Sequence, residues 1–302
     1  IKHQADELAF STVTRGATAK QTSWKKFDNK VAGVVSLILD KIKKFKMKVG
    51  DHVILMYTLS EDFVCALYAC FLTGMVPIPM NPIDANRLSE DIPCLVSVIR
   101  DYRVKTIMVN NDVEAILKNK PVSPLLKESN AYQTIKLRNT SKAKTSASLS
   151  SLQSRIDPLF KINNAVESGS TALIWLSYTE DGRRLAVKFT HNTISSVCKI
   201  MKETCQLESK NPVISCVRHT AGIGFIQSAL IGVYLGSSTH IIPPIDFATN
   251  PSLFFLTLSR YKVKDVYVTP QMMEYALRKV KSKDFNLDRV KNLMIGYDGR
   301  PD

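Results

Sequence analysis

The spacing of apolar residues in the first part of the chain predicts alternating helices and strands. Apolar side chains recur at helical spacing over residues 23–45, and Ser23 is a suitable N-cap for this helix. Short apolar runs at 53–58, 76–80 and 105–109 are typical of strands. Helical patterns are expected around these strands at 61–72, 86–101 and 113–118. Strands that alternate with helices favour a parallel sheet covered by helices on both faces.

The same alternation returns after residue 170. Strands are expected at 171–178, 186–190, 213–217, 239–242, 265–268 and 291–296. Helices are expected at 192–207, 221–235, 250–261 and 270–281. Asn192 and Thr193 open the first of these helices, and Gly236 ends the second, as capping preferences require. The sequence therefore predicts the α/β fold class, with two regions of similar architecture.

Residues 136–155 interrupt this alternation. They contain five lysines and arginines, no acidic residue, many serines and few large apolar groups. A segment of this composition cannot bury enough apolar surface to order itself, so it is interpreted as a mobile linker between two lobes. Contact with lipid headgroups, or phosphorylation of the serines, is the alternative interpretation.

The net charge and the cysteine positions indicate which kinds of partner the protein binds and in which compartment it works. The net charge of +14 favours acidic partners such as nucleotides, nucleic acid or anionic lipid surfaces, but an ordinary lysine-rich surface is the preferred explanation. No basic motif interleaved with aromatic residues is visible, which disfavours nucleic acid. The six cysteines show no CxxC and no zinc spacing. They indicate a reducing, cytosolic setting without a metal site, and peripheral attachment to organelle membranes is the alternative.

Neither a signal peptide nor a membrane-spanning segment is expected. The longest apolar stretch, residues 63–80, is interrupted by Gly74, Pro77 and Pro79, whereas a transmembrane helix needs about 20 largely apolar residues. The chain begins and ends within recognisable motifs, so it is interpreted as part of a longer protein.

Residues 171–191 carry the most informative pattern for chemistry. They combine a buried strand, a polar turn around Gly182, a second strand and the cap of a helix at His191. A loop that holds phosphate needs glycines for close backbone approach and N–H groups directed at the anion. This turn has one glycine, and it places Glu180 and Asp181 where the phosphate charge would lie. The arrangement indicates a nucleotide loop whose residues suit phosphate poorly.

Several separate segments resemble one family in the same order. Near the start, the chain resembles adenylate-forming enzymes, and in particular fatty acyl-AMP ligases, in ADELAFSTV, SWKKFDNKVAGVVSLIL and VGDHVILMYTLSEDFVCALYACFLTGMVPIPMNP. Residues 213–277 resemble the half of those ligases that forms the acyl pocket. The turn TEDGRRLAV and the ending DFNLDRVKNLMIGYDGRPD are similar to the disco-interacting protein 2 family, in a fungal-type form. The chain is identified as resembling the N-terminal part of a fatty acyl-AMP ligase-like domain of that family.

The resemblance implies a fold and a chemistry. The fold would be two stacked αβαβα subdomains with mainly parallel sheets, one over residues 1–165 and one over 166–302, without the family's later β-barrel and C-terminal lid. The chemistry would join a carboxylate to ATP, giving an acyl-adenylate and pyrophosphate. The family's eukaryotic members are associated with lipid metabolism, notably diacylglycerol balance.

The resemblance also implies two groups of site residues. The positions matching the ATP-phosphate loop are Ser177, Thr179, Glu180, Asp181, Gly182, Arg183 and Arg184. Ser177 and Thr179 could donate to phosphate, and either arginine could replace the family's lysine, as a fork rather than a point charge. Lys188, on the following strand, is expected to face solvent or a pocket wall.

The second group would line the acyl pocket. Its candidates are His219, Gly222, Gly224, Pro244, Phe247, Thr269, Pro270 and Gln271. His219 matches the histidine of the family's HDMG motif, but Thr220 replaces the aspartate. The glycines either let a ligand approach the backbone or only form the strand-to-helix turn. The apolar residues suit an acyl tail and a protein core equally, and no residue is assigned as catalytic.

Two functions compete. The favoured hypothesis is a divergent domain that binds an acyl or lipid ligand and has weakened or lost its handling of ATP phosphates, which leaves ATP and Mg²⁺ doubtful as cofactors. The alternative is an ATP-dependent ligase whose catalysis needs the parts beyond residue 302, so that these 302 residues alone are inactive. Expected partners are a fatty acyl or lipid molecule, the remaining subdomains of the same polypeptide and an anionic lipid surface.

Overall fold

The backbone forms two compact units that interleave along the sequence. The computed structural model describes residues 4–14, 20–45, 47–144, 147–163, 169–179, 183–281 and 284–296. Unit 1 comprises residues 1–27, 59–61 and 195–302, and unit 2 comprises residues 28–58 and 62–194. The predicted subdomains, 1–165 and 166–302, are instead two consecutive segments of the sequence. That division stays a prediction.

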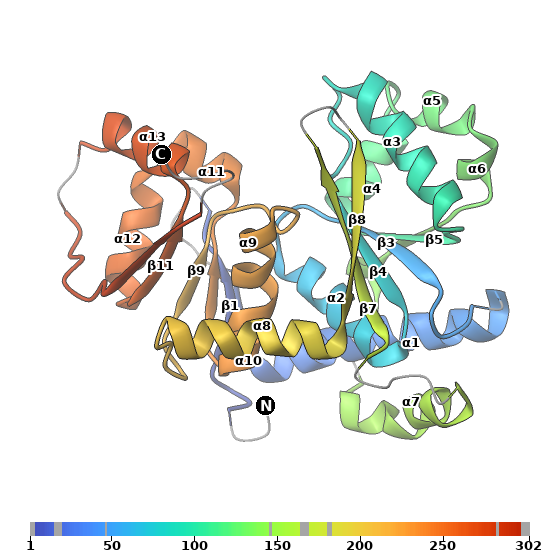
Figure 1. Cartoon of the computed structure of the whole chain (residues 1–302), viewed down its shortest axis with the longest axis horizontal. Helices are drawn as coiled ribbons and strands as arrows, with labels where there is room; N and C mark the ends of the chain where they lie inside the picture. Colours follow the sequence, from blue (N-terminus) through green and yellow to red (C-terminus); the bar gives the residue numbers. More distant parts are fainter. Residues whose placement is uncertain are drawn as a thin grey trace. The chain divides into compact units, whose positions relative to one another are not determined.

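The sheet of unit 2 has four parallel strands in the order β4-β3-β5-β6 (Figure 1). Their bounds are β3 His52–Met56, β4 Val76–Met80, β5 Thr106–Val109 and β6 Lys136–Asn139. Every residue of β5 is buried, as expected for an internal parallel strand covered on both faces. Strand β4 lies at the sheet edge, which explains how it accommodates Pro77 and Pro79, whose nitrogens cannot donate to a neighbouring strand.

Helices cover both faces of this sheet (Figure 1). Their bounds are α1 Trp24–Phe45, α2 Glu61–Thr73, α3 Leu88–Asp101, α4 Asn111–Lys118, α5 Ser123–Lys127, α6 Asn130–Gln133 and α7 Leu149–Asn163. The core packs Ile54 and Ile107 of the sheet against Leu95 and Leu117 of the helices. The elements predicted before residue 119 are confirmed, and their bounds shift by at most two residues.

The prediction of a mobile linker at residues 136–155 is wrong. This segment contains β6, a 3-10 turn at Thr140–Lys142 and the first half of α7. Strand β6 pairs with β5 through backbone hydrogen bonds, which polar residues form as well as apolar ones. Helix α7 buries Leu152 and Ile156, one turn apart, and its Leu149 amide donates to Asp28 at 3.1 Å. These buried side chains, the bond to Asp28 and the ion pair between Arg155 and Asp40 at 2.8 Å attach this helix to unit 2.

A long antiparallel hairpin, β7 Thr171–Tyr178 and β8 Arg184–Thr190, completes unit 2 (Figure 1). It is a separate two-stranded sheet, and β7 packs beside β4. Ile174 of β7 is fully buried in the core of unit 2. The hairpin predicted from residues 171–190 is confirmed, and its turn is the segment that resembles a phosphate loop.

Unit 1 is built on a six-stranded sheet in the order β12-β11-β9-β10-β1-β2. Its strands are β1 Leu8–Thr12, β2 Lys20–Ser23, β9 Val213–Ser215, β10 Thr239–Ile241, β11 Asp265–Val268 and β12 Asn292–Ile295. All neighbouring pairs are parallel except β1 and β2. The mainly parallel sheets of both units confirm the predicted α/β class.

The helices of unit 1 follow its strands. They are α8 His191–Thr204, which begins in unit 2, α9 Gly222–Phe225, α10 Ile231–Leu235, α11 Pro244–Thr249, α12 Ser252–Tyr261 and α13 Pro270–Lys279. The single helix predicted at 221–235 is wrong in one respect, because a π-helical turn at Ile226–Leu230 separates α9 from α10. Its Ser228 hydroxyl donates to the Gly224 carbonyl at 2.6 Å. Across the described residues, no helix is long and apolar enough to cross a membrane.

Candidate functional site

Strand order places the candidate pocket residues of unit 1 at one edge of its sheet. From the central strand β9, the chain continues to β10 on one side and then to β11 on the other. In open α/β sheets, ligands bind beyond the carboxyl ends of strands at such a reversal. His219 follows β9, Pro244 and Phe247 follow β10, and Thr269 follows β11. All eight predicted pocket residues therefore lie on the loops and helices that follow these strands at this edge.

His219 is buried and neutral. Its exposed fraction is 2%, and burial lowers its pKa from 6.5 to about 3. A buried imidazole resists protonation because the charged form loses its hydration. His219 can therefore act as a neutral donor or acceptor near pH 7, but it cannot supply a positive charge to an anion.

The two glycines after His219 differ in their surroundings. A Cβ atom added to Gly222 would meet nothing within 4 Å, whereas one added to Gly224 would lie 2.1 Å from the carbonyl oxygen of Arg218. Of these two glycines, Gly224 is the one whose backbone lies against the preceding loop, so it is the one required for packing. Open space at Gly222 is compatible with a ligand.

Three of the remaining pocket candidates have clear structural roles. The Thr269 hydroxyl accepts a hydrogen bond from the Met272 amide at 3.3 Å, and Pro270 occupies the first turn, so both serve to start α13. Phe247 is buried, with its ring 6.1 Å from those of Phe254 and Tyr275. Pro244 is half-buried at the start of α11, and Gln271 is exposed. Of this group, only Gln271 presents an uncommitted polar side chain to solvent.

The described part of the hairpin turn is closed by its own hydrogen bonds. The Thr179 amide donates to the Arg183 carbonyl at 2.9 Å, and the Thr179 hydroxyl accepts from the Arg183 amide at 3.0 Å. Ser177 is exposed on β7. The predicted candidates Glu180, Asp181 and Gly182 lie outside the described residues. The described groups hold the two strands together at the turn.

Arg184 is directed at helix α3. Its guanidinium donates to the Ser97 hydroxyl at 2.6 Å, forms an ion pair with Asp101, and lies 5.9 Å from the centre of the Tyr102 ring. On the paired strand β7, the Tyr178 hydroxyl lies 2.7 Å from the Cys94 thiol of α3. Burial, followed by the contact with Cys94, raises the pKa of Tyr178. These contacts attach the end of the hairpin to α3.

We expect a measurable but small coupling between Arg184 and Asp101. The pair is partly exposed, with side-chain exposures of 21% and 53%, so its coupling free energy in a double-mutant cycle of Arg184→Gln and Asp101→Asn should be about 0.5–1 kcal/mol. Urea unfolding of the four proteins measures it. The exposed pair Glu274 and Arg278, 3.8 Å apart on α13, is the matched control with a smaller expected coupling. Equal coupling for both pairs would contradict a specific attachment.

Ser97 and Asp101 were missed from the sequence. They lie more than 80 residues from Arg184, and their only signal is a spacing of four residues on an exposed helix face. No group of three metal-ligating side chains is found among the described residues.

The fold is that of adenylate-forming enzymes. A crystal structure of fatty acyl-adenylate ligase from Legionella pneumophila, in complex with acyl adenylate and pyrophosphate, superposes with a TM-score of 0.78 at 12% identity, over 97% of this chain and 47% of that one. The family model described as AMP-binding enzyme matches residues 2–299. The chain belongs to this AMP-binding enzyme family.

Curated relatives extend the comparison. An uncharacterized protein of Schizosaccharomyces pombe is 39% identical over 99% of this chain. The homeostatic regulator of DAG from Saccharomyces cerevisiae is 30% identical over 93% of it, and disco-interacting protein 2 of Drosophila melanogaster is 26% identical over 98%. The resemblance predicted to the disco-interacting protein 2 family is confirmed. The chain spans 20%, 17% and 16% of the lengths of these relatives.

Proposed function

We propose that this domain binds an acyl chain of a lipid-derived carboxylate and handles nucleotide phosphates weakly. The observation that carries the proposal is that Thr179 and Arg184, beside the hairpin's turn, already have partners. Arg184 is paired with Asp101 and Ser97, and Thr179 closes the turn on Arg183. A phosphate ligand would have to displace these contacts before it gained its own. The described donors therefore fit the phosphates of ATP poorly.

The acyl part of the proposal is supported by the edge of the unit 1 sheet. That edge combines a strand reversal, a neutral buried His219 and open space at Gly222. Neutral groups favour an apolar chain, because no buried charge has to be desolvated. One solved structure of this fold contains an acyl adenylate, as its description states.

The alternative is a complete ATP-dependent ligase. It is favoured by the family match over residues 2–299 and by the retained hairpin. In this case Asp101 holds Arg184 only until ATP binds, and ATP with Mg²⁺ competes for the guanidinium. Since the curated relatives are much longer, other parts of the polypeptide would complete catalysis.

Calorimetric titration with ATP, with and without Mg²⁺, separates the two functions. We expect ATP to bind with a Kd above about 1 mM, while a long-chain fatty acid binds more tightly. The Asp101→Asn variant releases Arg184 and should tighten ATP binding, and Arg184→Gln is the matched control that should not. Micromolar binding of ATP to the unaltered protein would favour the ligase.

The cellular role we propose follows from the relatives and the charge. A relative named as a homeostatic regulator of DAG suggests a role in lipid metabolism for this chain. The net charge of +14 supports a cytosolic protein that meets anionic lipid surfaces. Sedimentation with vesicles that contain phosphatidylserine, compared with neutral vesicles, tests this role.

A further inference from the structure

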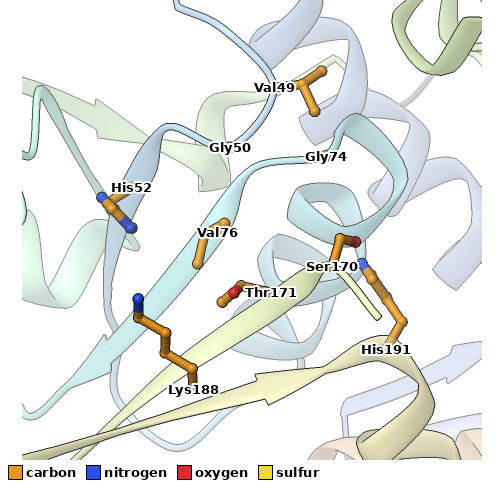
Figure 2. A pocket seen from close by; sticks show the side chains of 9 residues that line it. All are labelled: Val49, Gly50, His52, Gly74, Val76, Ser170, Thr171, Lys188 and His191. Carbon is orange, nitrogen blue, oxygen red and sulfur yellow. The ribbon is translucent and has the colours of Figure 1, made fainter. Parts of the chain in front are cut away.

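A small pocket lies in unit 2, at the opposite end of the hairpin from its turn. Its volume is about 240 Å³, and it is bordered by the first residues of three strands, His52 of β3, Val76 of β4 and Thr171 of β7 (Figure 2). Strand β7 spans eight residues, so its two ends are roughly 23 Å apart. The pocket is therefore separate from the segment that resembles a phosphate loop.

The pocket collects groups that bind anions and lacks acidic ones. Lys188, His52 and His191 line it together with the hydroxyls of Ser170 and Thr171, and no carboxylate is among its nine lining residues. Figure 2 shows the Lys188 side chain extending from β8 into the pocket, on the side of His52 and Thr171. An ammonium group beside hydroxyls is a suitable arrangement for an oxyanion.

The acidic residue that is next to the pocket in sequence already has its own partners. Asp51, next in sequence to two lining residues, accepts from the Lys48 amide at 3.0 Å and pairs with Lys105 at 3.4 Å. Among the described residues, Lys188 has no ion pair. Its charge is therefore available to a ligand that enters the pocket.

One imidazole is oriented by the backbone. The Nδ1 atom of His52 lies 2.9 Å from the carbonyl oxygen of Tyr102, which can only accept, so Nδ1 carries the proton. This leaves Nε2 as the nitrogen that can meet a ligand, as a donor when the ring is charged and as an acceptor from a protonated phosphate oxygen otherwise.

Two glycine turns form the upper wall of the pocket. Gly50 and Gly74 have φ values of +89° and +68°, and the Gly50 amide donates to the Gly74 carbonyl at 2.7 Å. A Cβ atom at Gly74 would lie 2.7 Å from Val49, so this wall is tightly packed. Pockets for drug-sized ligands occupy about 300–1,000 Å³, so the smaller cavity here suits a compact group.

We propose that this pocket binds the phosphate group of a compact ligand, either free in solution or presented by a lipid headgroup. Lys188 supplies the positive charge, and His52, Ser170 and Thr171 orient the oxygens. Tetrahedral phosphate uses several donors arranged around one small volume, and the pocket provides them from three separate elements. Binding here does not depend on ATP handling by the hairpin turn.

Direct titration tests the proposal. The probes are inorganic phosphate, glycerol 3-phosphate and vesicles of phosphatidic acid, each compared with phosphatidylcholine vesicles or chloride. Lys188→Gln and His52→Gln should each weaken binding, the former at least about tenfold, while the matched control Lys202→Gln removes an exposed charge on α8 and should not. Because Lys188 is exposed, Lys188→Gln should keep the thermal midpoint of the unaltered protein.

The outcomes separate the two phosphate sources and the proposed function. Binding of a soluble phosphate that depends on Lys188 supports a free ligand, and the same dependence with phosphatidic acid vesicles alone supports a headgroup. Binding to none of the three probes, or equal losses in Lys188→Gln and Lys202→Gln, would overturn the proposal. Arg184→Gln should leave phosphate affinity unchanged, which distinguishes this site from ATP binding at the turn.

Discussion

Gly224→Ala is expected to lower the free energy of unfolding by about 3 kcal/mol. The new Cβ atom would lie 2.1 Å from the Arg218 carbonyl oxygen and 2.9 Å from that of Val217. Both are backbone atoms, so no side chain can rotate away, and the loop that carries His219 must move instead. Urea unfolding, followed by far-UV circular dichroism, measures the loss.

Gly222→Ala is the matched control, because it adds the same methyl group two residues earlier in the same short helix, α9. Nothing lies within 4 Å of that position, so its stability should change by no more than about 0.5 kcal/mol. Equal unfolding midpoints for the two variants would refute the close approach at Gly224. A weaker affinity for fatty acid in Gly222→Ala, without loss of stability, would support a ligand in that open space.

Acidification is expected to destabilise unit 1 through His219. The unfolded chain protonates this imidazole near its ordinary pKa of 6.5, whereas burial lowers the folded pKa to about 3. Between these values the unfolded state binds more protons, so this contribution to stability is complete above about pH 7 and is lost as the pH falls toward 3. At pH 4 the loss should be about 3 kcal/mol.

Two measurements check this expectation. The imidazole resonances of His219 should not titrate between pH 5 and 8 in the folded protein. His219→Leu should show a shallower fall in the free energy of unfolding between pH 7 and 4 than the unaltered protein. His240 remains in both, and burial lowers its pKa to about 4, so the comparison isolates His219. A normal titration of His219 near pH 6.5 would contradict its burial.

Local patterns predicted most elements because burial in a parallel sheet is visible in the sequence. Strands β3 and β5 are continuous apolar runs, and Thr269 with Pro270 marks the start of α13. The same reasoning failed at α7, where Leu152 and Ile156 are buried although they stand among serines. It also missed the π turn at Ile226–Leu230, since an added residue in a helical turn leaves the apolar spacing nearly unchanged.

The sequence by itself determined the family, the α/β class and the position of the hairpin, because these depend on local apolar spacing and on ordered motifs. Only the tertiary structure decided which polar side chains already have partners and which can still meet a ligand. It pairs Arg184 with Asp101, buries His219 and places Lys188 and His52 in the lining of one pocket, over separations that local spacing does not encode. Such contacts arise when distant segments pack together, and they determine whether a charged side chain can still bind a ligand.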